Sequence, residues 1–141
     1  MFYYDITTWK KLVAYLFHFS DGTVYFNHDN LKSPTTKDEI IEVVKFAAEN
    51  GRKIRVLGSG HSRSALALSE DILVSLHKFK GLVEVDLKSK QVTVRGGTTL
   101  KELNALLEEK GLALSNLPAI ADPTIAGAIA TGEPCVDDWL V

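Results

Sequence analysis

The stretch Val56-Leu57-Gly58-Ser59-Gly60-His61-Ser62 follows directly on a run of β-type residues that begins at Lys53. Two glycines separated by one residue permit a tight turn with positive φ, so that successive backbone N–H groups can face one concavity. Such a nest binds phosphate oxygens, and the hydroxyls of Ser59 and Ser62 can add donors. The alternative is a simple turn between two elements. The stretch therefore indicates either a phosphate site or a plain turn at the end of a strand.

Two common kinds of glycine loop are excluded by the residues that follow. The dinucleotide-binding fingerprint needs a third glycine at position 63, where the chain has Arg63, and no long amphipathic helix follows. The P-loop requires Gly-Lys-Ser/Thr, and no lysine lies between Gly58 and Glu70. A nucleotide held by this loop would therefore be held by a different fold.

Two longer segments share one pattern: a threonine, a glutamate three positions on, apolar residues at helical spacing and a closing glycine. The first runs from Thr36 to Gly51 and the second from Thr99 to Gly111. Threonine followed three residues later by glutamate is a capping-box signature, and glycine suits a left-handed C-terminal cap. We therefore expect helices over residues 38–50 and 100–110, each followed by a short strand, at 53–57 and 112–114.

The residues between these segments have β character. Residues 72–76, Ile-Leu-Val-Ser-Leu, form a candidate buried strand. Residues 82–86 and 91–95 alternate valine with polar neighbours on either side of Lys88-Ser89-Lys90, which is typical of a hairpin. The expected order is α-β-β-β-β-α-β. This order predicts an α+β fold with a small mixed sheet flanked by helices.

The N-terminal residues 1–32 are expected to form a helix and a lead-in to the domain. A helix over residues 8–19 would place Leu12, Tyr15, Leu16 and Phe19 on one face. That helix either packs on the domain or attaches to a membrane surface through its tryptophan, lysines and aromatic residues. Its apolar run is too short to span a bilayer, and Asp5 and the lack of a small-residue cleavage site argue against a signal peptide.

The segment from Pro118 to Gly132 is rich in alanine and glycine. Asp122 is a natural N-cap and Pro123 suits the first helical position, so we expect a short helix to begin there. Its N-terminal N–H groups and dipole would face an anion. The small side chains of residues 126–130 would leave room for a flat ring or for another backbone. The alternative is a tightly packed buried helix.

The composition is that of one soluble domain. The chain has 141 residues, of which 45% are hydrophobic and 24% charged, and its formal net charge is −2. This balance carries no electrostatic footprint for nucleic acid, and there is no basic run to favour an anionic membrane. Cys135 is the only cysteine, so no internal disulfide forms. The sequence assigns no compartment, and the cytoplasm is the default expectation.

Taken together, these segments resemble the FAD-binding domain of the vanillyl-alcohol oxidase or p-cresol methylhydroxylase (PCMH) type. The resemblance covers residues 33–132. It rests on the helix opening at Thr35–Glu39, the glycine loop, the strand and glycine pair Val92–Gly97, and the segment Thr124–Gly132. Within the family the chain looks most similar to the aldonolactone and alditol oxidases. These are flavin-dependent oxidoreductases that oxidise CH–OH groups of sugar-type substrates with oxygen as acceptor.

The resemblance implies that FAD is the cofactor, and that the glycine loop and the small-residue segment grip its pyrophosphate and ribityl chain. In many relatives the histidine of the Gly-x-Gly-His-Ser pattern is bonded covalently to the 8α-methyl group of the flavin, and His61 occupies that place. The alternative is that His61 only hydrogen-bonds the loop or a non-covalent flavin. The cofactor-binding residues implied are Val56, Leu57, Gly58, Ser59, Gly60, His61, Ser62, Thr124, Gly127, Ala128 and Gly132.

The chain departs from the family after Gly132. Relatives continue with His-Gly and a further glycine, whereas residues 133–141 read Glu-Pro-Cys-Val-Asp-Asp-Trp-Leu-Val, an out-of-family tail. We therefore expect a partial FAD-binding domain without the catalytic half, which carries no catalytic residue and does not turn over by itself. The alternatives are a non-catalytic nucleotide-binding module and an inert truncated fragment.

Overall fold

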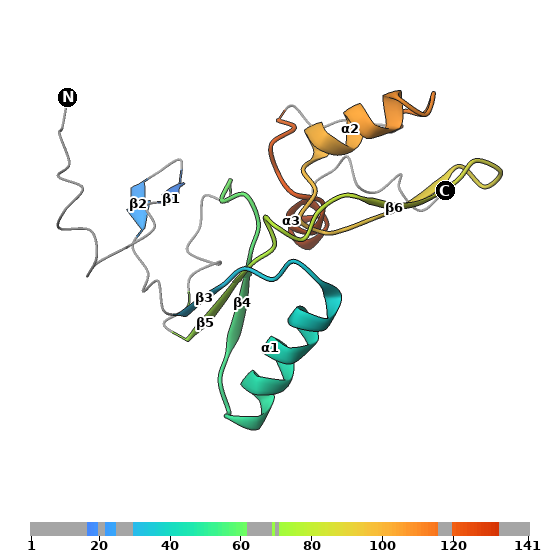
Figure 1. Ribbon diagram of the computed structural model, residues 1–141. Helices are drawn as coiled ribbons and strands as arrows, with labels where there is room; N and C mark the ends of the chain where they lie inside the picture. Colours follow the sequence, from blue (N-terminus) through green and yellow to red (C-terminus); the bar gives the residue numbers. More distant parts are fainter. Residues whose placement is uncertain are drawn as a thin grey trace, which may run out of the picture.

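The computed structural model describes residues 17–19, 22–24, 30–61, 69, 71–115 and 120–132. In Figure 1 a parallel sheet with helix α1 lies below, and a long hairpin accompanied by helix α2 lies above and to the right. Helix α3 lies between these two parts. The α+β class expected from the sequence is confirmed, with the strands divided among three small sheets.

The first part is a three-stranded sheet of β3 (Leu31–Lys32), β4 (Ile54–Leu57) and β5 (Ile72–Ser75). The strand order is β3-β5-β4, and β5 pairs in parallel with both neighbours. All four residues of β5 are buried, as expected for the central strand of a parallel sheet covered on both faces. Sequence reasoning found β4 and β5 but missed β3, whose two residues carry no periodic signal.

Helix α1 (Lys37–Glu49) covers one face of this sheet, where Ala47 packs with Ile72 and Val74. The Thr36 hydroxyl accepts a hydrogen bond from the Glu39 N–H at 3.2 Å, as the sequence predicts. The Glu39 carboxylate reaches one residue further back, to the Thr35 N–H at 2.6 Å, and this bond lowers its pKa. The predicted helix is therefore confirmed within one residue at each end.

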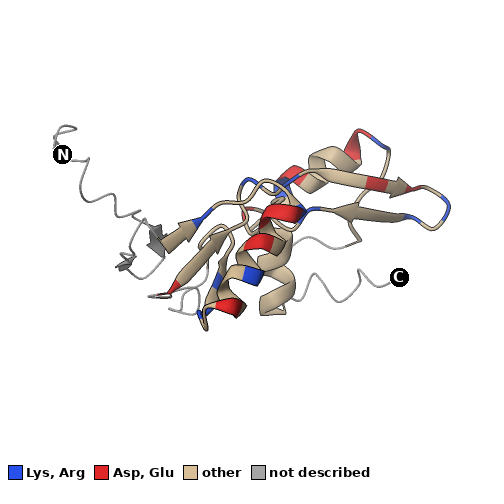
Figure 2. Ribbon diagram, turned by 60° about the horizontal axis from the view of Figure 1, so that its bottom comes forward, with Lys and Arg blue, Asp and Glu red and all other residues tan. Residues whose placement is uncertain are grey.

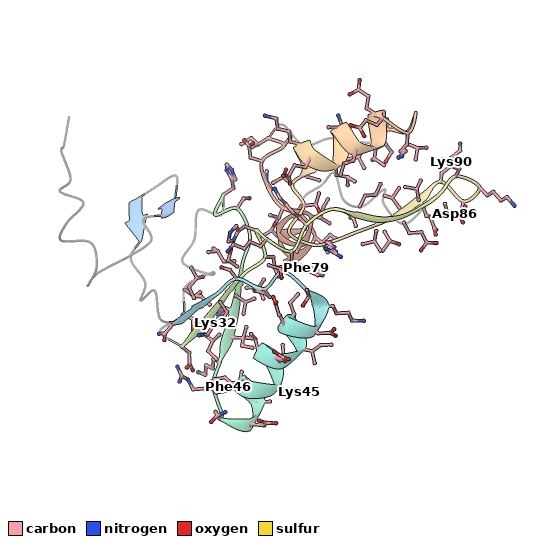
Figure 3. The ribbon with its side chains drawn as sticks, in the orientation of Figure 1. Lys32, Lys45, Phe46, Phe79, Asp86 and Lys90 are labelled. Carbon is pink, nitrogen blue, oxygen red and sulfur yellow. The ribbon has the colours of Figure 1, made fainter. Side chains whose placement is uncertain are left out.

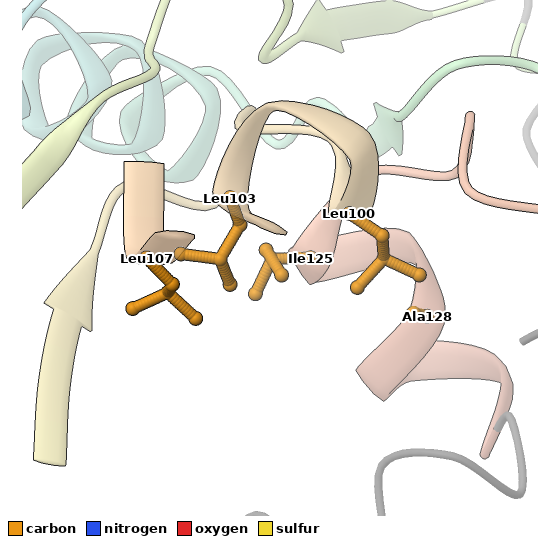
Figure 4. Packing of buried hydrophobic residues seen from close by; sticks show 5 residues of the cluster. All are labelled: Leu100, Leu103, Leu107, Ile125 and Ala128. Carbon is orange, nitrogen blue, oxygen red and sulfur yellow. The ribbon is translucent and has the colours of Figure 1, made fainter. Parts of the chain in front are cut away.

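The second part is an antiparallel hairpin of β6 (Leu82–Asp86) and β7 (Gln91–Val94) with helix α2 (Leu100–Glu108) packed on it. Asp86 and Lys90 lie at the far end of the hairpin (Figure 3), where the Asp86 carboxylate accepts hydrogen bonds from the N–H groups of Lys88 and Ser89. The predicted hairpin is confirmed. The core between α2 and α3, shown in Figure 4, consists of Leu100, Leu103, Leu107, Ile125 and Ala128.

Helix α2 carries the complete capping box that the sequence predicts. Thr99 and Glu102 bond reciprocally, at 3.1 Å from the Glu102 N–H to the Thr99 hydroxyl and at 3.0 Å from the Thr99 N–H to the Glu102 carboxylate. The other carboxylate oxygen of Glu102 binds the ammonium group of Lys80, 2.5 Å away. The hydrogen bonds from Lys80 and Thr99 lower the pKa of Glu102. This carboxylate therefore ties the connection between β5 and β6 to the start of α2.

Two expected elements are wrong. The strand expected over residues 112–114 is irregular backbone, because the Leu112 N–H turns back to the carbonyl of Leu107 and helps to close α2. The helix expected over residues 8–19 is contradicted at Phe17–Phe19, which form β1 and pair antiparallel with β2 (Gly22–Val24). Two aromatic residues alternating with a histidine favour a strand once a hairpin partner follows. Residues 8–16 lie outside the described part.

The surface of the described residues has no strong charge bias. Figure 2 shows acidic and basic positions interspersed over the helices and strands. Within that part of the chain, no helix is long and apolar enough to cross a membrane, and no group of three or more metal-ligating side chains occurs. Charge and metal ligands therefore do not locate a functional site.

Candidate cofactor site

The glycine loop begins where β4 ends at the carboxyl edge of the parallel sheet. Leu57 is buried and closes the strand, and its carbonyl accepts a hydrogen bond from the Leu76 N–H. Gly60 has a φ of 78°, in the left-handed region that favours glycine. Among the described residues, the backbone N–H groups of Ser59, Gly60 and His61 have no hydrogen-bond partner. These open donors are what an anion-binding nest requires.

The loop contacts the start of α3 (Ile125–Thr131) across a long interval of sequence. A Cβ atom placed on Gly58 would lie 2.6 Å from Oγ1 of Thr124 and 3.9 Å from Cα of Gly127. Only glycine allows this approach, so the residue is required by space rather than by φ. The structure thus brings the two sequence-predicted segments together into one site.

The start of α3 differs from the prediction. The N-cap is Thr124, whose hydroxyl accepts from the Gly127 N–H at 3.2 Å, and the helix begins two residues after Pro123. The carbonyls of Ala121 and Pro123 accept hydrogen bonds from the first N–H groups of α2, which fixes residues 121–123 against the start of that helix. Asp122 is therefore exposed beside the helix start instead of capping it.

The N-terminal donors of α3 are also occupied, contrary to the expectation that they face an anion. The Ile125 N–H donates to the carbonyl of Thr98 at 2.8 Å, and the Ala126 N–H donates to that of Gly96 at 3.0 Å. The Gly127 N–H is taken by its own N-cap. Helix α3 therefore supplies a wall of small residues beside the loop, and the free donors are those of the loop itself.

Residues 96–98, which we call the strap, hold α3 against the end of β5. A Cβ atom on Gly97 would lie 1.8 Å from the carbonyl oxygen of Leu76 and 2.6 Å from that of Phe79. Phe79 lies at this junction in Figure 3, and the guanidinium of Arg95 lies 5.4 Å from the centre of its ring. The sequence analysis did not predict this packing role of the glycine pair.

The remaining predicted site residues differ in exposure. Val56 is 55% exposed and His61 is exposed, whereas Ala128 is buried in the α2 cluster. Gly132 ends α3 with a φ of 63°. Ser62 lies outside the described residues. Of the small residues in α3, Gly127 is therefore the one whose backbone the loop approaches.

One polar pair at the same edge was not predicted. The buried hydroxyl of Ser75, the last residue of β5, lies 2.9 Å from Nδ1 of His77. The sequence carries no periodic signal for this pair, because β5 ends at Ser75 and His77 lies in the turn that follows.

The loop with open N–H donors at the carboxyl edge of a parallel sheet, closed by a wall of small residues, defines a nucleotide-binding α+β module. Comparison with known proteins narrows this class. Residues 29–136 match the FAD binding domain family, and the chain belongs to that family. The expected cofactor, FAD, is thereby confirmed for the family, and the close approach of Gly58 to α3 provides the kind of cradle that it needs.

The curated relatives agree with the resemblance to aldonolactone oxidases. L-gulonolactone oxidase of Mus musculus is 39% identical over 99 residues, which cover 70% of this chain and 22% of that protein. D-arabinono-1,4-lactone oxidase of Kluyveromyces lactis is 36% identical over 103 residues, covering 70% and 20%. This chain thus spans about a fifth of the length of these relatives.

Solved structures show the same fold. Cholesterol oxidase from B. sterolicum matches with a TM-score of 0.62 and 24% identity, covering 77% of this chain and 21% of that chain. An alkyldihydroxyacetonephosphate synthase matches with a TM-score of 0.64 and 22% identity, covering 72% and 20%. This chain therefore aligns with about a fifth of each of these two solved chains.

Proposed function

We propose that the chain forms the pyrophosphate-binding part of an FAD-dependent oxidoreductase that acts on a sugar lactone or polyol with oxygen as acceptor. The observation that carries the proposal is the glycine loop, which has three N–H donors without a partner among the described residues and is closed by the contact of Gly58 with Thr124. The names of the relatives, gulonolactone and arabinonolactone oxidases, support the substrate class.

The residues of this chain have distinct roles in the proposal. The N–H groups of Ser59, Gly60 and His61 bind the pyrophosphate oxygens, a contact that uses backbone alone. Gly58 and Gly127 keep the loop and α3 close enough to form one wall. FAD held there would supply the hydride-accepting redox chemistry needed to oxidise a CH–OH group. The exposed imidazole of His61, at the outer end of the loop, is the candidate for covalent attachment to the flavin.

The test is a titration of the 141-residue chain with FAD, followed by flavin fluorescence. The Gly58→Ala variant should bind FAD at least tenfold more weakly, because the added methyl group displaces Thr124 and changes the loop. The matched control is Gly51→Ala. Gly51 has a φ of 62° with nothing within 4 Å of its Cβ position, so the control strains the backbone at the opposite end of β4 without touching the loop.

Equal FAD affinity in the Gly58→Ala and Gly51→Ala variants would refute the placement of the pyrophosphate. Oxygen uptake with gulonolactone, arabinonolactone and xylitol, measured on the chain joined after α3 to the remainder of a relative, then tests the reaction. Binding of FAD without turnover on any of them would favour the non-catalytic binding module over the oxidoreductase.

A further inference from the structure

The hydrogen bond between Ser75 and His77 orients an imidazole just after the carboxyl end of β5, at the sheet edge where the glycine loop also begins. Ser75 is 3% exposed, while His77 is exposed. The turn that carries His77 is fixed by the hydrogen bond from the Phe79 N–H to the carbonyl of Leu76, at 2.8 Å. The imidazole is thus anchored at Nδ1 by a buried group, and its other nitrogen is directed away from that anchor.

The distance between the Ser75 hydroxyl and Nδ1 fits a hydrogen bond in either direction, so we assign the tautomer of His77 from the needs of the buried hydroxyl. A buried hydroxyl needs an acceptor for its proton, and Nδ1 of His77 is the partner found for Ser75 among the described residues. When the hydroxyl donates to Nδ1, the neutral imidazole carries its proton on Nε2. The outward nitrogen is therefore a hydrogen-bond donor.

The topology places this donor at the edge that carries the nest. Ser75 is the register partner of Leu57, the residue that precedes the glycine loop, and neighbouring strands lie about 4.8 Å apart. Ile72 and Val74 face α1, so Ser75 and the imidazole bonded to it lie on the opposite face. Ligands of parallel α/β sheets bind outside the carboxyl ends of the strands, and both features occur at that edge.

We propose that His77 is a further phosphate-binding residue of the site, donating from Nε2 to an oxygen of the cofactor's pyrophosphate, and that Ser75 is the positioning residue that sets its tautomer. The inference rests on the proposed function. A nucleophilic role for Ser75 is excluded by its burial, because no substrate reaches a hydroxyl that is 3% exposed.

The experiment measures binding of ADP, which carries the pyrophosphate without a flavin, by calorimetry on the full chain. His77→Ala should weaken ADP binding tenfold or more, about the loss expected for one hydrogen bond to a charged group. Ser75→Ala should weaken it by a smaller factor, and should have no further effect when His77 is already alanine. Lys78→Ala is the matched control, because it removes an exposed neighbouring cation and should leave ADP affinity within about twofold.

A second measurement is independent of affinity. In long-range ¹H–¹⁵N spectra, His77 should show the Nε2-protonated tautomer in the free protein, and its Nε2 signal should move when ADP is added. Unchanged ADP affinity in His77→Ala, with Gly58→Ala still impaired, would overturn this inference and leave the proposed function standing. Absence of both ADP and FAD binding by the unaltered chain would overturn both.

Discussion

The contact between Gly58 and Thr124 predicts a specific coupling between two substitutions. In Gly58→Ala the new methyl carbon would lie 2.6 Å from Oγ1 of Thr124, about 0.8 Å closer than the 3.4 Å at which ordinary contact begins. Overpacking of this kind costs about 1–3 kcal/mol of folding free energy. Thr124→Ala removes the N-cap of α3, which costs about 1 kcal/mol.

The double variant should be more stable than the sum of the two costs implies. Thr124→Ala deletes the oxygen that clashes and leaves Cβ at 3.8 Å, an ordinary contact. The double variant should therefore lose little more folding free energy than Thr124→Ala alone. The coupling free energy between the two substitutions should be about 1–2 kcal/mol. Urea unfolding followed by circular dichroism measures all four proteins of the cycle.

Two controls make the cycle specific. Thr124→Ser keeps the hydroxyl, so it should not relieve Gly58→Ala. Gly51→Ala, whose cost comes from a φ of 62° rather than from a neighbour, should combine additively with Thr124→Ala. Additivity of Gly58→Ala and Thr124→Ala within about 0.5 kcal/mol would refute the packing of the loop on α3.

Three further predictions concern other parts of the molecule. Gly97→Ala should destabilise the protein by about 3 kcal/mol or more, because the new Cβ atom would meet backbone atoms. Gly96→Ala should cost about 1 kcal/mol, because its Cβ atom would meet side chains at 3.1 and 3.6 Å. Thermal unfolding of the two variants measures the difference. Glu102 has a lowered pKa, so its contribution to stability is complete above the ordinary value of 4.5 and is lost as the pH falls through its folded pKa. Urea midpoints between about pH 5 and pH 3 should therefore fall less steeply in Glu102→Gln than in the unaltered protein. The last prediction concerns a protein in which the chain is joined after α3 to the remainder of a relative. In that protein, His61→Ala should abolish flavin fluorescence on a denaturing gel while FAD still binds. A fluorescent band in the variant would contradict covalent attachment of the flavin at His61.

Local chemistry in the sequence predicted most of the elements. The threonine–glutamate–glycine pattern placed α1 and α2 within two residues at each end, because capping and helical periodicity act within one segment. The hairpin likewise follows from alternation around its turn. Leu31–Lys32 could not be predicted, since so short a strand is specified by its pairing with Leu73 and Val74 rather than by its own residues.

The sequence predicted the two segments of the candidate site, but only part of how their backbones are arranged and hydrogen-bonded. The glycine loop was located from the spacing of its glycines, and its left-handed residue, Gly60, is where that spacing predicts it. The start of α3 was misplaced because Asp122 and Pro123 form a good local start signal that tertiary hydrogen bonds override. The occupation of the α3 donors by Gly96 and Thr98 depends on residues distant in sequence, and no local rule gives it.

The Gly58–Thr124 contact also has a consequence for the order in which the chain folds during synthesis on the ribosome. The sheet, α1 and the glycine loop are encoded before residue 77, whereas the wall that closes the loop is encoded after residue 120. A growing chain therefore exposes the loop long before the threonine that fits against it has been made. Contacts between segments so far apart form slowly, because the intervening chain must first be ordered. If the loop binds the cofactor as proposed, capture follows the folding of the hairpin and α2, and a bound cofactor would report that these elements have already docked.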